Sequence, residues 1–375
     1  MGDTSSESIS IIIPNLNGRE VLERCLKAVA ALDYPASLVE VILIDNASVD
    51  GSGYFTQRHY PNVKIVALPT NVGFAEAINV GAKHANGNYL FLLNNDAAPD
   101  SDCIKRLLAP IRAGESDCTT AQIIDADRKT IHSAGGGMNF HGIAFQANEG
   151  MPYIAAAKDT PPQPVLFPCG AAMLIAAQLF KDVGGMDKSF FAYFEDVDFG
   201  WRLWIQGYRV HYVPNAVVTH QQSSTSRFLW LPKLRVLHIR NPLMMIYKNY
   251  EQRFLDAILP VAWILTSQRT RNLSQWPQER FMINDEMHLA ETAAQPADSA
   301  AGMTIPALAV SDFVALNQWA DQFDALQLQR SNVQARRTVS DADLLHLFKE
   351  PFRYSEADSE YQHKQDSLCQ AFGIN

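Results

Sequence analysis

The N-terminal quarter of the chain alternates short apolar runs with amphipathic stretches of helical period, which limits the chain to few folds. The apolar runs and the amphipathic stretches between them occupy, in chain order, residues 9–13, 19–32, 39–44, 53–60, 63–67, 74–85 and 89–93. Strands that alternate with helices in this way form parallel βα units. We therefore predict an α/β fold, with a mostly parallel, Rossmann-like sheet that carries helices on both faces.

Composition excludes several classes of protein. The chain has 375 residues, of which 47% are hydrophobic and 19% charged, so a disordered chain, a collagen and a polytopic membrane protein are all excluded. Its net charge of −9 argues against nucleic acid as a partner. The five cysteines include no CxxC pair, which argues against a disulfide framework or a zinc site. Residues 1–8 lack the basic and apolar regions of a secretory signal, so we expect a cytoplasmic protein.

The remainder of the chain divides into a loop-rich part and a helical part. Residues 134–168 are rich in Gly and Pro and predict long loops that could close over a ligand. Beyond about Thr225 the pattern becomes helical, interrupted by a low-complexity linker at 293–302. We predict a catalytic domain at 1–225 and a helical domain at 226–375. Helical spacing over 308–326, and a helix start at Ser340 that we expect to begin the final helix, fit packing or homodimerisation equally.

Polar residues follow three of the predicted strands, at 14–17, 45–48 and 94–96. In parallel α/β sheets, ligands bind at the carboxyl ends of the strands, so these clusters are candidate binding residues. The alternative is that they form turns and cap the helices that follow. A dinucleotide site is disfavoured because Gly51 and Gly53 lack the third glycine of that fingerprint.

A second cluster places Glu195, Asp196 and Asp198 within a run of aromatic residues. Burying a carboxylate costs several kcal/mol unless it binds a cation, a proton or hydrogen-bond donors. Such surroundings can raise the pKa of a carboxylate toward that of a useful general base. The alternative is a solvated helix start, where acidic residues favour the helix dipole.

His220 ends a further apolar run and is a candidate partner for Asp96. Alone, a histidine is more often a packing or surface residue. Together, an imidazole and a carboxylate would suit Mn²⁺ or Mg²⁺, with diphosphate oxygens and water as the remaining ligands.

Five segments resemble, in order along the chain, the motifs of glycosyltransferase family 2, and within it the bacterial rhamnosyltransferase-like branch. They are residues 10–17 (SIIIPNLN), 44–52 (IDNASVDGS), 71–79 (NVGFAEAIN), 92–96 (LLNND) and 190–198 (FFAYFEDVD). The resemblance implies a GT-A fold and an inverting, metal-dependent transfer from a nucleotide-diphosphate sugar.

The resemblance also implies roles for individual residues. Asp96 and His220 would ligate the metal, and Asn94 stands where many relatives carry a first aspartate. Asp196 would be the catalytic base, with Glu195 as its rival for that role. The nucleotide-sugar pocket would comprise Pro14, Asn15, Asn17, Asp45, Asn71, Phe74, Asn95 and Asp96.

Two further segments bear on specificity. Gly170 and Ala171 are small enough to let a sugar approach the backbone, although helix–sheet packing explains them equally. Trp201 and Trp204 could stack on an acceptor sugar, but their helical spacing favours core packing.

The beginning of the helical part is basic. Between 227 and 271, eight Arg and Lys residues face two acidic ones, a local balance of 8 − 2 = +6. One use is a solvated helix pair packed on the catalytic domain. The other is a patch that docks on an anionic membrane surface, on the inner face of the cytoplasmic membrane.

Taken with the resemblance, these features predict an inverting glycosyltransferase of bacterial surface polysaccharide synthesis, acting on a glycan or a lipid-linked acceptor. The first expected donor is dTDP-rhamnose and the second a UDP-sugar. The alternatives are a sugar-nucleotide transferase, which should carry a Gly-rich basic loop after the first strand, and a non-catalytic carbohydrate-binding relative.

Overall fold

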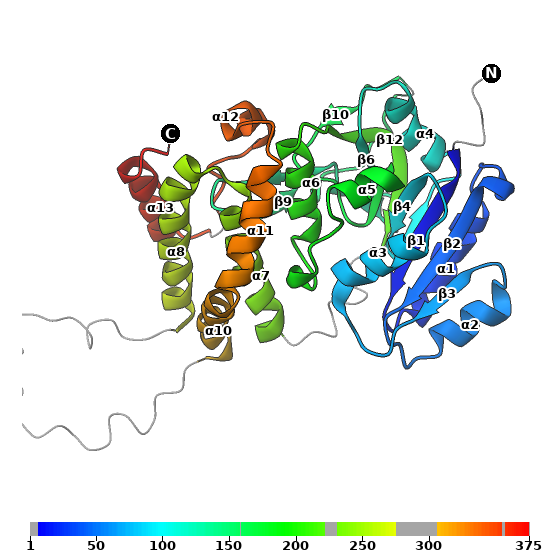
Figure 1. Cartoon of the computed structure of the whole chain (residues 1–375), viewed down its shortest axis with the longest axis horizontal. Helices are drawn as coiled ribbons and strands as arrows, with labels where there is room; N and C mark the ends of the chain where they lie inside the picture. Colours follow the sequence, from blue (N-terminus) through cyan, green and yellow to red (C-terminus); the bar gives the residue numbers. More distant parts are fainter. Residues whose placement is uncertain (1–6, 158, 222–230, 275–305, 355–356, 375) are drawn as a thin grey trace, which may run out of the picture.

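A computed structural model of the chain describes residues 7–157, 159–221, 231–274, 306–354 and 357–374. Figure 1 shows a sheet with flanking helices on one side of the molecule and a group of helices on the other. The predicted domain boundary near Thr225 and the linker at 293–302 lie outside the described residues.

The first half of the main sheet is parallel, as predicted. Its strands are β1 (Ile9–Asn15), β2 (Val39–Asp45), β3 (Lys64–Ala67) and β4 (Tyr89–Leu93). The helices that connect them are α1 (Arg19–Ala30), α2 (Ser52–His59) and α3 (Gly73–His84). All three pairings, β1 with β2, β1 with β4 and β2 with β3, are parallel, so the carboxyl ends of these strands meet at one edge.

The second half of the main sheet is mixed. Its strands are β5 (Ala97–Pro99), β6 (Cys118–Asp125), β7 (Ile131–Ser133), β10 (Gln163–Pro164), β11 (Ala172–Ala176) and β12 (Val210–His220). Strand β11 runs antiparallel between β4 and β6, whereas β12 is parallel to β6. The strand order along the sheet is β10-β12-β6-β11-β4-β1-β2-β3.

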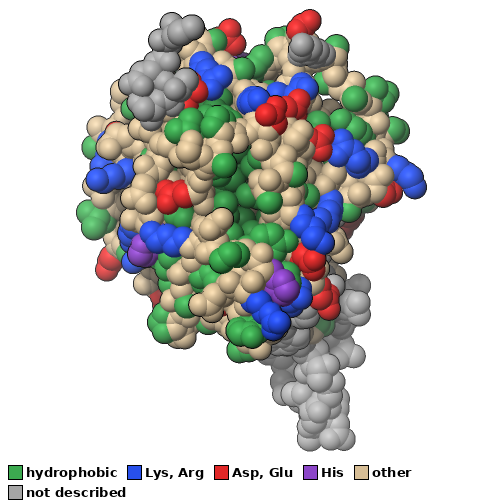
Figure 2. Space-filling model, turned by 90° about the vertical axis from the view of Figure 1, so that its right-hand side faces the viewer, with side chains coloured by type: hydrophobic (Ala, Val, Ile, Leu, Met, Phe, Trp, Pro, Cys, Tyr) green, Lys and Arg blue, Asp and Glu red, His purple; other side chains and the backbone are tan. Residues whose placement is uncertain are grey.

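Helices cover both faces of this sheet because side chains alternate along each strand. Ile11 and Ile13 pack against α1 and α4 (Cys103–Arg112) on one face. Ile12 packs on the opposite face, against α3, α5 (Ala177–Asp182) and α6 (Glu195–Ile205). Figure 2 views the molecule from the side of β1 to β3, where hydrophobic side chains gather in a central hollow with charged side chains around it.

The helical part shares a hydrophobic core with α6. Its helices are α7 (Leu231–Asn249), α8 (Gln252–Ser274), α10 (Ala307–Asp321), α11 (Phe323–Ala335), α12 (Asp341–Leu344) and α13 (Ser359–Ala371). Trp201 of α6 is fully buried in this core, edge-on to Tyr250 and Phe348. Trp201 is therefore a core residue, as the favoured prediction had it. Trp204 donates its indole N–H to the carbonyl of Val165 at 2.9 Å.

The prediction of long loops at 134–168 is confirmed for one part of the segment and wrong for another. Residues 147–157 and 159–162 form turns and irregular backbone, apart from an isolated bridge at Pro152. The Gly-rich start of the segment instead forms a hairpin of β8 (Gly136–Met138) and β9 (Ala144–Gln146), whose tip packs on the helical part. A Cβ at Gly136 would lie 2.0 Å from the ring of Phe167, so this glycine admits an aromatic ring against the backbone. In this hairpin, the high glycine content therefore allows close packing and does not indicate a loop.

The C-terminal helices differ from the prediction in one respect. The hydroxyl of Ser340 accepts the N–H of Asp343 at 3.3 Å and caps α12, as expected. This helix ends at Leu344, however, and α13 is the last helix, capped by Asp358. No helix within the described residues is both long and apolar enough to cross a membrane.

Candidate active site

A pocket of about 450 Å³ opens where the strands of the main sheet end, a volume typical of small-molecule sites. It brings together every predicted site residue except Asp45, which ends β2 beside it and accepts the Ser48 N–H at 3.0 Å. The predicted residues that line it are Pro14, Asn15, Asn17, Asn71, Phe74, Asn95, Asp96, Gly170, Ala171, Glu195, Asp196 and His220.

One wall of the pocket, here called the strand-end wall, consists of polar residues that follow β1, β2 and β4. At its centre the Asn15 amide donates to the hydroxyl of Ser52 at 2.9 Å and accepts from the Asn95 amide at 2.8 Å. Both asparagines are almost fully buried. These bonds join the ends of β1 and β4 to the start of α2, so the wall is preformed.

Asn46 belongs to the strand-end wall and to the candidate cluster 45–48, although the family resemblance assigned it no role. Its side chain donates to Asn71 Oδ1 at 2.9 Å and accepts the Val72 N–H at 2.9 Å. It therefore fixes the loop before α3, where Asn71 and Phe74 line the pocket. The sequence pattern that could have identified Asn46 is its place directly after Asp45 at the end of a predicted strand.

Asp96 and His220 meet at the pocket, where His220 Nε2 lies 2.8 Å from Asp96 Oδ1. Asn94 Nδ2 lies 3.4 Å from the same ring nitrogen, while its buried Oδ1 has no hydrogen-bond partner. A carboxylate, an imidazole and an amide oxygen with a free lone pair fit a cation such as Mn²⁺ or Mg²⁺. No group of three Asp, Glu, His or Cys side chains suited to a metal occurs in the described part of the chain.

Sequence reasoning missed His132 and Gln146, which also line the pocket. The ring of His132 stacks on that of His220, with 5.1 Å between centroids and 3.1 Å between the two Nδ1 atoms. Burial and the neighbouring His220 lower the pKa of His132 to about 4, so it is neutral at pH 7. Neither residue carried a sequence signal, because only the hairpin and β7 bring them to the strand ends.

The opposite wall of the pocket, here called the loop wall, consists of residues 191–196. Asp196 lies in the first turn of α6, where its two oxygens accept the backbone N–H groups of Gly170 and Val197, each at 2.8 Å. Gly170 approaches closely because it has no side chain, and a Cβ there would lie 3.1 Å from Asp196 Oδ2. Gly170 therefore serves the orientation of Asp196 as well as the pocket surface, whereas Ala171 only lines the pocket.

Both carboxyl groups of the loop wall, those of Glu195 and Asp196, have raised pKa values. Burial, and then the charge of Asp196, raise the pKa of Glu195 to about 8. Burial also raises the pKa of Asp196, against the opposing effect of the N–H groups of Gly170 and Val197. Glu195 Oε2 is buried with no hydrogen-bond partner, whereas both oxygens of Asp196 have one. Glu195 is therefore the neutral member of the pair at pH 7.

The backbone that leads into α6 is strained. A γ-turn with positive φ lies at Phe191 (φ 64°), and Tyr193 and Phe194 are also left-handed, at φ 65° and 69°. Such conformations cost about 1–3 kcal/mol each in residues other than glycine, and they cluster at functional sites. The surrounding structure must therefore hold this loop in place.

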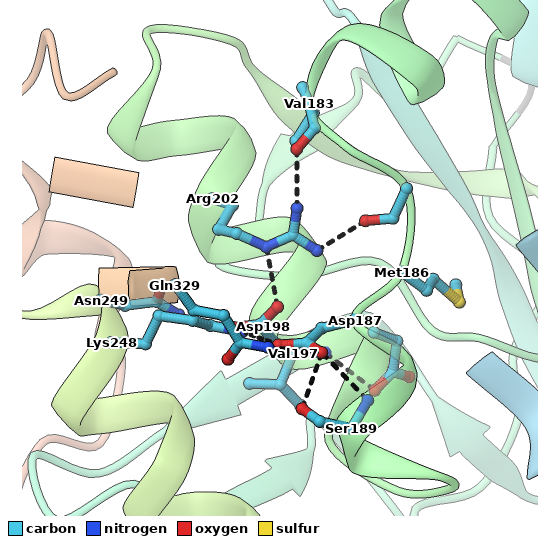
Figure 3. Close-up of polar contacts among 12 residues, drawn as sticks. Val183, Met186, Asp187, Ser189, Val197, Asp198, Arg202, Lys248, Asn249 and Gln329 are labelled. Carbon is cyan, nitrogen blue, oxygen red and sulfur yellow. Dashed lines mark hydrogen bonds and ion pairs between the residues drawn. The ribbon is translucent and has the colours of Figure 1, made fainter. Parts of the chain in front are cut away.

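The third acidic residue, Asp198, is structural. It is fully buried and pairs with Arg202 of the same helix at 2.8 Å and with Lys248 of α7 at 2.9 Å. Lys248 also pairs with Asp187, at 2.5 Å, just before the strained loop. Figure 3 shows these side chains converging from α6, α7 and the segment before η3 (Lys188–Phe190). Lys248, from the helical part, thus binds Asp187 and Asp198, which flank the loop wall on either side.

Three of the eight basic residues between 227 and 271 form contacts inside the protein, whereas Lys233 and Arg253 are exposed and Arg227 lies outside the described residues. Lys248 is 2% and Arg240 7% exposed, and Arg235 pairs with the buried Asp312 of α10 at 2.5 Å. These side chains stabilise contacts within the protein and are not free to meet a membrane. This corrects the use of the local charge as an argument for membrane docking.

Comparison with known proteins identifies a family model and several related glycosyltransferases. Residues 10–184 match the model of Glycosyl transferase family 2. An N-acetylglucosaminyl-diphospho-decaprenol L-rhamnosyltransferase of Mycobacterium tuberculosis (strain CDC 1551 / Oshkosh) is 30% identical over 231 residues, 55% of this chain and 74% of that protein. A poly-beta-1,6-N-acetyl-D-glucosamine synthase of Staphylococcus epidermidis is 25% identical over 239 residues, 61% of this chain and 53% of that protein.

Solved structures share the fold. GalNAc-T7 with UDP, GalNAc and Mn²⁺ superposes with a TM-score of 0.53 at 18% identity, covering 77% of this chain and 54% of that one. S. aureus TarS 1–349 with UDP-GlcNAc gives a TM-score of 0.51 at 16% identity, covering 97% of this chain and 92% of that one. The predicted GT-A fold with a helical C-terminal region is thereby confirmed. The chain belongs to glycosyltransferase family 2 and has a rhamnosyltransferase-like relative.

Proposed function

We propose that the protein transfers a sugar, with inversion, from a pyrimidine nucleotide-diphosphate donor to a glycan or lipid-linked acceptor in bacterial surface polysaccharide synthesis. One observation carries the proposal: a buried carboxylate oriented by two N–H donors, Asp196, lines the same pocket as the Asp96–His220 pair. A base and a diphosphate site in one pocket are the parts that inverting transfer requires. Membership of the family favours this function over sugar-nucleotide synthesis.

The strand-end wall is the proposed nucleotide site. Its buried amides, led by Asn15 and Asn46, hold the wall in shape through their own hydrogen bonds, so a base and a ribose would meet a preformed polar surface. The mycobacterial relative, named for L-rhamnose transfer, makes dTDP-rhamnose the first candidate donor. The two similar structures, solved with UDP or UDP-GlcNAc, make a UDP-sugar the second.

In the proposed reaction Asp196 removes the proton of the acceptor hydroxyl as that oxygen attacks the anomeric carbon. The bond from the sugar to the diphosphate breaks on the opposite side, so no enzyme nucleophile is needed. Asp196 suits this role because its two N–H partners favour the ionised form and fix its direction. Glu195 is disfavoured as the base because its pKa of about 8 leaves it protonated near neutral pH.

Asp96, His220 and Asn94 would hold Mn²⁺ or Mg²⁺, which supplies positive charge to the leaving diphosphate when bound. His132 would orient His220, because the Nδ1 atoms of the two rings lie 3.1 Å apart, within hydrogen-bond distance.

Association with an anionic membrane surface is a further part of the proposal. Its support now comes from exposed apolar side chains on two helices that contact each other, Leu231 of α7 (65% exposed) and Phe313 of α10 (55% exposed). Lys233, two residues after Leu231 on α7, is also exposed. In vesicle sedimentation with anionic lipid, Phe313→Ser should weaken binding about fivefold, ~1 kcal/mol. Leu328→Ser, at a leucine of α11 that is 65% exposed, should leave it unchanged, and equal effects would contradict this docking face.

The test of the function is a panel of dTDP- and UDP-sugars, scored by released nucleoside diphosphate, with and without Mn²⁺. We expect one donor class to be turned over when an acceptor glycan is present, with stimulation by Mn²⁺. No release with any donor, acceptor or metal would overturn the proposal and favour the non-catalytic carbohydrate-binding alternative.

A further inference from the structure

Asn241 of α7 contacts the strained loop through its side-chain amide. The two hydrogens of its amide nitrogen are shared among three carbonyl oxygens of that loop, those of Phe190 (3.0 Å), Ala192 (2.9 Å) and Tyr193 (2.8 Å). Asn241 is fully buried, in the helical part of the chain. One amide group therefore spans the γ-turn and the left-handed residue that follows it.

Arg240 fixes the orientation of this amide. Its guanidinium donates through Nε and Nη2 to Asn241 Oδ1, at 3.0 and 2.9 Å. Because a guanidinium has donors only, the atom that it contacts must be the amide oxygen, and the nitrogen must face the loop. Arg240 also donates to the carbonyl of Ser189 at 3.0 Å, so the two residues act on the loop as one unit.

The other side of the loop is held by α3. The carbonyl of Phe191 accepts the N–H of Phe74 at 2.6 Å, at the start of α3. Gly73 permits this approach, since a Cβ there would lie 2.4 Å from the Phe191 oxygen. The Phe191 carbonyl thus points to the strand-end wall, while those on either side of it point to Asn241.

We propose that Asn241 is a positioning residue for the transfer reaction: by holding the carbonyls of 190, 192 and 193, it sets the path of the loop that delivers Asp196 to the pocket. The inference rests on the proposed function, because it takes Asp196 as the base. Without these donors the loop can relax to ordinary backbone conformations, and Asp196, which follows two residues after Phe194, moves with it. The strand-end wall has its own hydrogen bonds and does not depend on Asn241.

The test replaces Asn241 with aspartate, which has the same shape. Asn241→Asp keeps an oxygen for Arg240 but presents a second oxygen, and no donor, to the three carbonyls. We expect kcat to fall about 100-fold, as for a displacement of catalytic groups by roughly 1 Å. The Kd for UDP or dTDP should stay within about twofold of the parent. Asn317→Asp, the same change at an exposed site on α10, is the matched control and should leave both unchanged.

A second readout does not require turnover. Hydrogen exchange of the amides in 190–197 should be faster in Asn241→Asp and in the milder Asn241→Ser, with exchange in β1 and β2 unchanged. If transfer is absent in the parent, the proposed function fails, and this readout still decides whether Asn241 holds the loop. Unchanged exchange at 190–197, a kcat within threefold of the parent, or a parallel loss of nucleotide binding would overturn the inference.

Discussion

Asn15, Asn46 and Asn71 of the strand-end wall are held by partners from neighbouring βα units, whereas the loop wall is held by α7, about 50 residues further along the chain. The first wall follows from local chemistry: a buried strand ends, and polar residues begin. The second depends on buried charges and an amide from the helical part. This difference indicates that the helical part is a component of the active site. Changes in either wall should therefore have separable effects.

The largest expected effect on stability follows from removing Lys248. Lys248→Met leaves Asp187 and Asp198 buried without their shared cation, which should lower the free energy of unfolding by about 3–5 kcal/mol. Urea denaturation measures this. Lys233→Met, at an exposed position of the same helix, is the control and should change stability by less than about 0.5 kcal/mol. A loss below about 1 kcal/mol in Lys248→Met would mean that α7 does not secure the loop wall.

The next effect concerns the strand-end wall. Asp96→Asn removes the charged member of the proposed metal site. With Mn²⁺ present, binding of UDP or dTDP should weaken at least about tenfold, ~1.4 kcal/mol, and most of the Mn²⁺ dependence should disappear. Titration calorimetry with and without Mn²⁺ measures this. Asp102→Asn, at the half-exposed N-cap of α4, makes the same change away from the pocket. Equal Mn²⁺ dependence in parent and Asp96→Asn would place the metal elsewhere.

The smallest effect is the pH dependence of stability. Because the folded protein raises the pKa of Glu195 from 4.5 to about 8, it keeps a proton that the unfolded chain releases. This contribution is fully present below about pH 4.5 and is lost as the pH rises toward 8. The melting temperature of Glu195→Gln should therefore fall less than that of the parent between about pH 5 and about pH 8. Glu149→Gln, at an exposed position, should behave like the parent; identical slopes in all three proteins would refute a protonated Glu195.

The sequence predicted the strand-end wall because its signal is local. The strands, their order and the residues that end them can all be recognised within a few positions of each other, as for Asn15 and Asp96. His220 was singled out because it ends an apolar run and Asp196 because it lies among aromatic residues, and the family resemblance then assigned their roles. Asp45 was assigned a pocket position in the same way, but its side chain is used in the turn to Ser48.

The loop wall could not be predicted in the same way because its partners are distant in sequence. Nothing near Asn241 or Lys248 indicates that they reach residues 187–198, and a basic stretch has the same composition whether it is solvated or buried. Likewise, the glycines of the β8–β9 hairpin resemble a loop until the ring of Phe167 is seen against Gly136. Long-range packing of this kind leaves no periodic signal.

The central claim is that the two walls have different functions: the strand-end wall binds the nucleotide, and the loop wall removes the proton of the acceptor. Asp196→Asn tests it most directly, with Asp182→Asn, at an exposed position of α5, as its control. In one preparation, transfer is measured with the best donor, and nucleotide binding by calorimetry. The account predicts that transfer falls below a few per cent of the parent rate while the Kd for the nucleoside diphosphate stays within about twofold. Transfer above that level, or an equal loss of binding and transfer, would contradict it.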